Sequence, residues 1–279
     1  MKRISILGSG WLGFPLAVEL NKADDYLVKA SSRNEKRLIA IRKAGIEAYA
    51  YDIDILGTQQ ASEQDVFLQA DILVINITSK SVEAFTHLIS KIEESTIQQV
   101  LFISSTSVYA NSPKLNSADV TEESTEQLKQ CPLLKIENLF LNNDHFKTTV
   151  IRLSGLIGYQ RHPGRFFLTA DENDVVYCKT IKNPDAQVNM IHRDDCIGII
   201  NAIIQQNCWG NVFNACASQH PTRREFYKVA MKYLGDVDPI FSGQTDSVGK
   251  VISNKKVKGQ LGYSFIHDDL LNFKSMPFN

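Results

Sequence analysis

A cluster of small hydroxyl side chains follows an apolar run in the segment "LFISSTSVYA" (101–110). Ser104, Ser105, Thr106 and Ser107 stand where a buried strand would end. Hydroxyl groups at such a position can hydrogen-bond the carbonyl or alcohol oxygen of a substrate. Their chemistry therefore depends on whether the surrounding elements place this strand end in a ligand-binding cleft.

A second pattern with chemical meaning lies at the N-terminus, where "ISILGSGWLGFPLAVEL" contains G-x-G-x-x-G at Gly8, Gly10 and Gly13. It follows a strand and opens a helix, which is the context of a dinucleotide site. Gly8 allows the tight turn, Gly10 a close approach of a pyrophosphate, and Gly13 close packing of helix and sheet. The alternative is a glycine-rich turn without a ligand. The predicted cofactor-binding residues are Gly8, Ser9, Gly10, Trp11, Leu12, Gly13, Ser32, Arg33, Asp52, Asn76 and Ser104.

The end of the second predicted strand, "KASSRNEKR", favours NADP over NAD. Ser31 and Ser32 stand where an acid would bind the ribose 2′-hydroxyl of NAD, and Arg33 follows them. Hydroxyls with a guanidinium suit a 2′-phosphate. The alternative is that Arg33 belongs to a solvated helix face. Asp52 is placed either to contact the adenine or to cap its own loop.

The order of elements predicts how these residues are positioned. Strands and helices alternate through the first half of the chain without hairpin signals, which indicates an α/β fold with a doubly wound, parallel, Rossmann-type sheet. We predict strands at 3–7, 26–30, 46–51, 70–76, 99–104, 148–154 and 211–215. We predict helices at 12–21, 34–43, 63–69, 82–94, 122–142, 196–206 and 224–234, with the helix at 122–142 interrupted near Pro132. Asn34 is the expected N-cap of the second helix. We assign 1–158 to a dinucleotide-binding domain, 189–215 to a segment that rejoins the sheet, and 159–279 to a smaller C-terminal substrate lobe.

The composition limits the classes of molecule that the protein is expected to bind. A net charge of −1 favours neither nucleic acid nor membrane surfaces, and we expect a small-molecule substrate and a monomer or homodimer. The apolar run near the N-terminus is too short for a signal peptide. Five cysteines without a C-x-x-C pair fit reduced thiols and a cytoplasmic location. The six histidines show no metal-ligand spacing, so no metal is predicted.

Four segments together resemble the extended short-chain dehydrogenase/reductase family, which contains nucleotide-sugar epimerases and dehydratases. They are "FISSTSVYA", "VIRLSGLIGYQRHPGR", "VNMIHRDDCIGIINAII" and "NVFNACASQHPTRREFY", in the family's order. The resemblance implies that Ser105 is the catalytic hydroxyl that binds the reacting oxygen, and that Arg161 and Arg165 lie near substrate phosphates. A strand-capping role is the alternative for Ser105, and a surface role for the two arginines.

The chain departs from that family at its general acid/base. The Tyr-x-x-x-Lys pair is missing from the predicted helix "LKQCPLLKIENLFL". Cys131 and Lys135 keep the four-residue step, whereas alignment on Glu137 places Lys129 and Leu133 there. A thiol can titrate, but we expect Cys131 to be structural. Tyr109 and Tyr159 are the first candidates for a replacement acid/base, and Tyr109 is grouped with Ser105 as catalytic.

These features predict an NADP-dependent (or NAD-dependent) oxidoreductase or epimerase-like protein. It would act on a small hydroxyl or carbonyl compound, with a nucleotide sugar as one candidate. The rival prediction is a redox sensor or scaffold that binds the dinucleotide without turnover, since the tyrosine is absent. A third is a structural subunit with an empty pocket.

Overall fold

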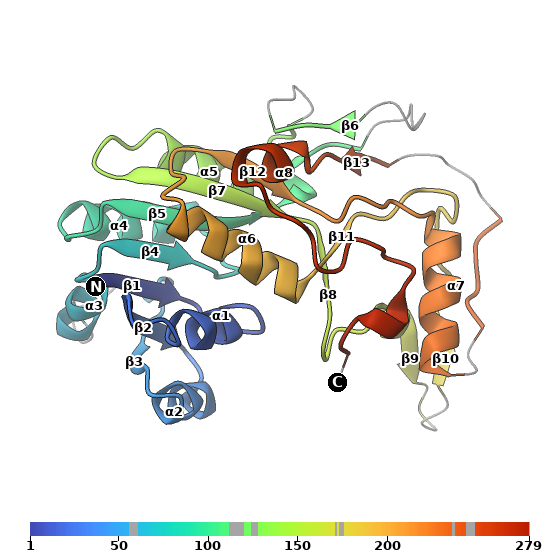
Figure 1. Cartoon of the computed structure of the whole chain (residues 1–279), viewed down its shortest axis with the longest axis horizontal. Coiled ribbons are helices and arrows are strands. Elements are labelled where there is room, and N and C mark those ends of the chain that lie inside the picture. Colours follow the sequence, from blue (N-terminus) through green and yellow to red (C-terminus); the bar gives the residue numbers. More distant parts are fainter. Residues whose placement is uncertain are drawn as a thin grey trace. The chain divides into compact units, whose positions relative to one another are not determined.

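A computed structural model describes residues 1–55, 61–111, 120–123, 128–170, 172, 176–235, 238–243 and 249–278. Its main element is a seven-stranded sheet with the order β12-β7-β5-β4-β1-β2-β3 (Figure 1). The pairs β1–β2, β1–β4, β2–β3 and β4–β5 are parallel. The strand order reverses between β1 and β4, which is where doubly wound sheets bind ligands. The predicted α/β, Rossmann-type fold is confirmed.

The chain forms two compact units, and the first comprises 1–108, 129–152 and 200–213. Its elements begin with β1 (Lys2–Leu7), α1 (Gly13–Leu20), β2 (Tyr26–Ser32), α2 (Glu35–Lys43), β3 (Glu47–Ala50), α3 (Ala61–Leu68) and β4 (Ile72–Ile75). They continue with α4 (Val82–Glu93), β5 (Gln99–Ser105), the 3-10 turn η2 (Thr106–Val108), α5 (Pro132–Leu141) and β7 (Lys147–Leu153). The core strand β4 is buried along its whole length, as expected for a strand covered on both faces. Asn34 caps α2 by accepting a hydrogen bond from Arg37 N, as predicted.

The second unit comprises 109–128, 153–199 and 214–279. Its strands pair in twos: β8 (Gly155–Ile157) with β11 (Met190–His192), β9 (Leu168–Ala170) with β10 (Val176–Cys178), and β6 (Val120–Thr121) with β13 (Val251–Ile252). The remaining elements are η3 (Pro163–Arg165), α7 (Arg223–Leu234), α8 (Lys255–Leu261) and η4 (Phe273–Ser275). Helix α6 (Arg193–Gln205) and strand β12 (Val212–Ala215) each contribute residues to both units. A buried apolar cluster that includes Phe226, Met231 and Phe273 forms the core of this unit.

The long helix predicted at 122–142 is wrong in its first half. Residues 120–121 form β6, Leu128 makes an isolated bridge with Tyr109, and α5 begins only at Pro132. Residues 124–127 lie outside the described part. Proline has no N–H to donate and is favoured in the first turn of a helix, so it starts α5 rather than interrupting it.

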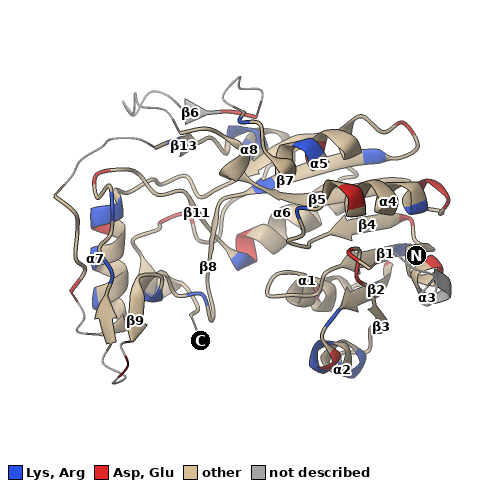
Figure 2. Cartoon of the chain, turned by 180° about the vertical axis from the view of Figure 1, so that it is seen from behind, with Lys and Arg blue, Asp and Glu red and all other residues tan. Residues whose placement is uncertain are grey.

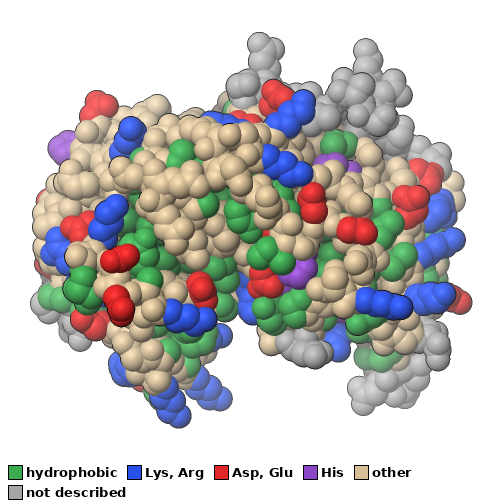
Figure 3. All heavy atoms as spheres, viewed as in Figure 1, with side chains coloured by type: hydrophobic (Ala, Val, Ile, Leu, Met, Phe, Trp, Pro, Cys, Tyr) green, Lys and Arg blue, Asp and Glu red, His purple; other side chains and the backbone are tan. Residues whose placement is uncertain are grey.

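Charges of both signs are interspersed on the described side chains of the face in Figure 3, and basic residues concentrate on α2 (Figure 2). Within the described residues, the helices are all too short or too polar to cross a membrane.

Candidate functional site

The loop after β1 has the geometry that the glycine pattern predicts. Gly8 has φ +97°, and a Cβ there would overlap the carbonyl of Asn76. A Cβ at Gly13 would overlap the carbonyl oxygen of Gly8, so this glycine lets the start of α1 pack on the loop. A Cβ at Gly10 would meet nothing within 4 Å. Gly8 and Gly13 are therefore required by the fold, whereas Gly10 faces open space.

That open space is part of a pocket of about 410 Å³ within the first unit. The pocket lies at the carboxyl ends of β1, β2, β3 and β4, beside the reversal of strand order. Seven of the predicted cofactor residues line it: Gly8, Ser9, Gly10, Ser32, Arg33, Asp52 and Asn76. Eight other lining residues were not predicted to bind the cofactor, namely Leu7, Asn34, Tyr51, Ile53, Asp54, Ile77, Thr78 and Ser79. Leu7 ends β1, and the other seven lie within four residues of the end of β2, β3 or β4. That position at strand ends is the signal that could have found them.

Three predicted residues of the glycine segment do not line the pocket. Leu12 is buried in the core, Trp11 is half-buried, and Gly13 is the first residue of α1. The N-cap position of α1 provides no side-chain hydrogen bond to the helix start. The amides of this first turn therefore receive no side-chain cap, and such amides can bind an anion.

The charged groups of the pocket are one arginine and two carboxylates. Arg33 is 65% exposed and lies 3.4 Å from Asp52 and 3.9 Å from Asp54. Asp52 Oδ1 also accepts the N–H of Asp54, as in a loop-capping role, and Asp54 accepts a 2.9 Å hydrogen bond from Ser79. Arg33 precedes α2 and so does not belong to its solvated face.

Ser31 has a different position from the one expected for a ribose partner. It is fully buried, and its Oγ accepts a hydrogen bond from Gly8 N at 3.1 Å. Its carbonyl accepts from Ser9 N at 2.8 Å. Asn76 Nδ2 donates to Gly8 O at 3.0 Å. Ser31 and Asn76 therefore hold the glycine loop from the two neighbouring strands.

The hydroxyl cluster at the end of β5 divides between two environments. Ser104 is buried and donates to Glu137, which also pairs with buried Arg152 at 2.7 Å. Ser105 is half-buried, and its Oγ accepts the N–H of Ser107 at 3.1 Å. Ser104 therefore lies outside the described pocket and belongs to a buried ionic network, whereas Ser105 Oγ keeps its proton as a donor.

Tyr109 is almost wholly buried, and its hydroxyl donates to Asn214 at 2.8 Å. This position favours a structural role over the catalytic one predicted for it. Cys131 is half-buried at the N-cap of α5, and Lys135 is exposed on that helix. Lys129 lies before α5. Because α5 begins at Pro132, neither alignment of the Tyr-x-x-x-Lys step places both of its residues on the helix.

Tyr159 of the second unit lies in a strained and highly charged setting. Its φ is +48°, its hydroxyl donates to Asp194 at 2.8 Å, and the Arg193 guanidinium stacks 3.6 Å above its ring. Burial and the bond to Asp194 raise the pKa of Tyr159. Arg161 and Arg165 are exposed.

His192, Asp194 and His267 form a cluster that sequence spacing did not predict. Burial opposes ionisation of Asp194, but hydrogen bonds with His192, Tyr159 and His267 hold its pKa at about 2. His267 comes from a segment 73 residues beyond Asp194, so no local motif could show the grouping.

Comparisons with known proteins agree with this geometry. A family model described as "NADP oxidoreductase coenzyme F420-dependent" matches residues 3–126. Among solved structures, the UDP-glucuronic acid 4-epimerase of Bacillus cereus, in complex with UDP-glucuronic acid and NAD, has a TM-score of 0.74 at 16% identity, with 98% of each chain covered. A short-chain dehydrogenase/reductase superfamily protein of Agrobacterium tumefaciens with bound NAD has a TM-score of 0.73 at 13% identity, with 98% of this chain and 96% of that one covered. The predicted resemblance is thereby confirmed in the fold.

Protein YeeZ of Escherichia coli K12 is 30% identical over 291 residues, which cover 97% of this chain and 98% of YeeZ. The chain therefore belongs to the same family as Protein YeeZ, with the fold of the nucleotide-sugar epimerases and short-chain dehydrogenase/reductases.

Proposed function

We propose that this protein binds NADP(H), or less favourably NAD(H), in the pocket of the first unit, and acts as an oxidoreductase or epimerase-like enzyme on a small hydroxyl or carbonyl compound. The observation that carries the proposal is the glycine loop, in which Gly10 alone of the three glycines faces open pocket space. A nucleotide sugar is one candidate substrate, because the Bacillus cereus neighbour binds one. The substrate lobe is assigned to 159–279.

The residues present fit a dinucleotide. Ser9 Oγ is buried beside the pocket and has no hydrogen-bond partner among the described residues. The uncapped start of α1 adds backbone N–H groups and the positive end of a helix dipole. Both features suit the negative pyrophosphate of a dinucleotide.

The preference for NADP rests on Arg33. Its exposed guanidinium stands at the pocket edge, where it could form a charge-assisted hydrogen bond with a 2′-phosphate. Asp52 and Asp54 would repel that phosphate, so Arg33 also has to offset their charge. The family model that matches residues 3–126 describes NADP oxidoreductases, which favours the same cofactor.

A bound nicotinamide cofactor supplies hydride transfer. Ser105 would donate its Oγ proton to the reacting oxygen of the substrate and so orient it. With Tyr109 buried against Asn214, the proton for this oxygen would come from water or from another cleft residue; Tyr159 remains the tyrosine to test. The free thiols of all five cysteines favour a reducing compartment such as the cytoplasm.

Titration of the purified protein with NADPH and with NADH tests the cofactor proposal, and turnover with a panel of carbonyl compounds tests catalysis. We expect tighter binding of NADPH and slow turnover, since general acid/base help is worth about 10²–10⁴ in rate. Binding without any turnover would support the alternative function as a dinucleotide sensor. The absence of the family's tyrosine also favours that alternative. Failure to bind either nucleotide would refute both functions.

A further inference from the structure

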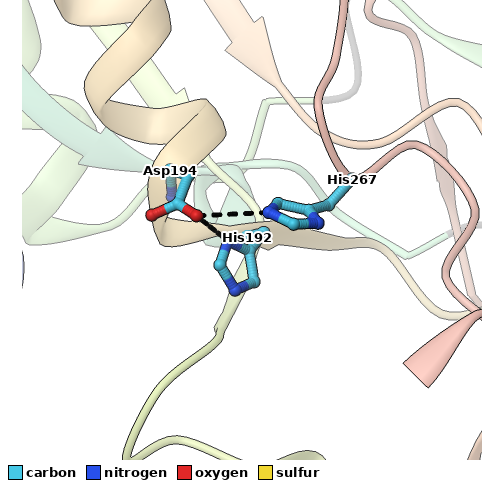
Figure 4. Close-up of side chains that lie close together, drawn as sticks. All are labelled: His192, Asp194 and His267. Carbon is cyan, nitrogen blue, oxygen red and sulfur yellow. Dashed lines mark hydrogen bonds and ion pairs between the residues drawn. The ribbon is translucent and has the colours of Figure 1, made fainter. Parts of the chain in front are cut away.

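We propose that His192, Asp194 and His267 of the second unit bind a divalent transition-metal ion of the zinc class. Figure 4 shows both imidazole rings directed at the same carboxylate oxygen of Asp194. Asp194 Oδ2 lies 3.3 Å from His192 Nδ1 and 3.2 Å from His267 Nε2. All three potential ligand atoms lie within 4.8 Å of one another.

The two distances from Asp194 Oδ2 match those between neighbouring ligands of a tetrahedral ion. Zinc bonds of about 2.0–2.1 Å to nitrogen and oxygen place neighbouring ligand atoms roughly 3.3 Å apart at the tetrahedral angle. Two imidazoles with one carboxylate are donors that suit zinc and its neighbours better than calcium or magnesium. His192 is fully buried and His267 is 7% exposed, while the Asp194 side chain is 27% exposed. The open side at Asp194 leaves room for water as a fourth ligand.

The surroundings orient His192 and Asp194 as outer groups orient metal ligands. His192 Nε2 lies 3.4 Å from the carbonyl of Pro277, which favours a proton on Nε2 and a lone pair on Nδ1. Tyr159 donates to Asp194 Oδ1 and leaves Oδ2 for the ion.

Asp195 fixes the segment that carries the second imidazole. Its carboxylate accepts the backbone N–H groups of Ile266 at 2.6 Å and of His267 at 3.1 Å. These contacts hold the backbone of His267, while its ring Nδ1 has no hydrogen-bond partner among the described residues.

Two hydrogen bonds compete with the ion. The first joins His267 Nε2 and Asp194 Oδ2 over 3.2 Å, and an ion held by both atoms replaces it. The second is at His192. The backbone N–H of Asp194 donates to His192 Nδ1 over 3.2 Å, and an ion at Nδ1 has to displace it. This amide belongs to the first turn of α6, where N–H groups have no intrahelical partner and water can replace the imidazole. The competition lowers the affinity without blocking the site. A bound ion would then link the C-terminal segment to the start of α6.

The test uses the full chain, freed of metal with a chelator and titrated with Zn²⁺ by calorimetry. Co²⁺ serves as a spectroscopic probe, because four-coordinate Co²⁺ has intense visible bands. Loss of an outer-shell partner alone costs roughly 10–100-fold in metal affinity, so loss of a direct ligand should weaken binding by at least about 100-fold. We expect the parent to bind one ion per chain. Asp194→Asn and His267→Gln should each bind Zn²⁺ with an affinity lower by that factor.

His145→Gln is the matched control, because His145 is exposed and outside the cluster. It should bind Zn²⁺ as the parent does and keep the Co²⁺ bands. Asp194→Asn preserves the shape of the side chain, so we expect this variant to fold, and circular dichroism can verify it. The test therefore remains valid if His267→Gln does not fold. The proposal is overturned if the parent binds no stoichiometric Zn²⁺, if folded Asp194→Asn binds as tightly as the parent, or if His145→Gln abolishes binding.

Discussion

Gly10→Val should abolish dinucleotide binding and leave the fold intact. Gly10 has no positive φ, and a Cβ there meets nothing within 4 Å, so the Cβ of a valine adds neither backbone strain nor overlap to the free protein. We therefore expect the free energy of unfolding to change by no more than about 0.5 kcal/mol. The same side chain fills the space that a pyrophosphate requires beside the loop. A loss of at least about 2.7 kcal/mol of binding energy, roughly 100-fold in Kd, follows.

Gly13→Ala provides the contrast within the same loop. Its Cβ would overlap the carbonyl oxygen of Gly8, so the loop has to shift even in the free protein. Overpacking of this kind typically costs about 1–3 kcal/mol of stability. Gly13→Ala should therefore lower both stability and affinity, whereas Gly10→Val lowers affinity alone.

Calorimetric titration with NADPH and urea unfolding measure the two quantities in parallel. Gly259→Val is the control, because Gly259 is exposed on α8, has open space around it and lies outside the pocket. It should bind NADPH as the parent does. If Gly10→Val binds NADPH with the parent's Kd, the pyrophosphate does not lie on this loop and the reasoning fails.

Three further changes test other parts of the molecule. Arg33→Ala should weaken NADPH by about ten- to a hundredfold and NADH much less, because a charge-assisted bond is worth about 1.5–3 kcal/mol; equal losses in the two titrations would remove Arg33 from the 2′-phosphate site. Ser105→Ala should lower turnover and leave the Kd for NADPH nearly unchanged; an unaltered rate would exclude Ser105 from the reaction. Burial, together with Arg165, lowers the pKa of His162 to about 4, whereas an unfolded histidine titrates near 6.5, so stability should fall by up to about 3 kcal/mol as pH drops from 6.5 to 4. His162→Phe should flatten that part of the urea-unfolding profile, and an identical slope in the variant would contradict the assignment.

Features set by neighbouring residues could be predicted from the sequence. The Asn34 cap and the close approach of Gly13 to Gly8 depend on residues a few positions apart, and both have the predicted form. The alternation of strands and helices predicted the parallel sheet, and the apolar segment that forms β4 indicated a strand buried on both faces. The prediction of a helix before Pro132 was wrong. It gave more weight to the helix-forming residues of a polar stretch than to the proline, which starts α5.

Features set by distant partners could not be predicted. Ser104 looks like a cleft hydroxyl in sequence, but it donates a hydrogen bond to Glu137, which pairs with Arg152 in the buried network. His267 and Asp194 become neighbours only because the C-terminal segment returns to the start of α6. The types and sequence spacing of these residues give no information about either contact.

The hydrogen bonds of Ser31 and Asn76 with the glycine loop have a consequence for the affinity of ligand binding. Two neighbouring strands hold the Gly8 peptide in place, through its N–H and its carbonyl, before any ligand arrives. A loop held in this way loses little conformational entropy when it binds, so more of the contact energy remains as affinity. Ser31→Ala would remove one of these bonds without touching the ligand. The loop would then sample more conformations, the Gly8 amide would exchange its hydrogen faster, and the ligand would meet a surface that it has to order itself.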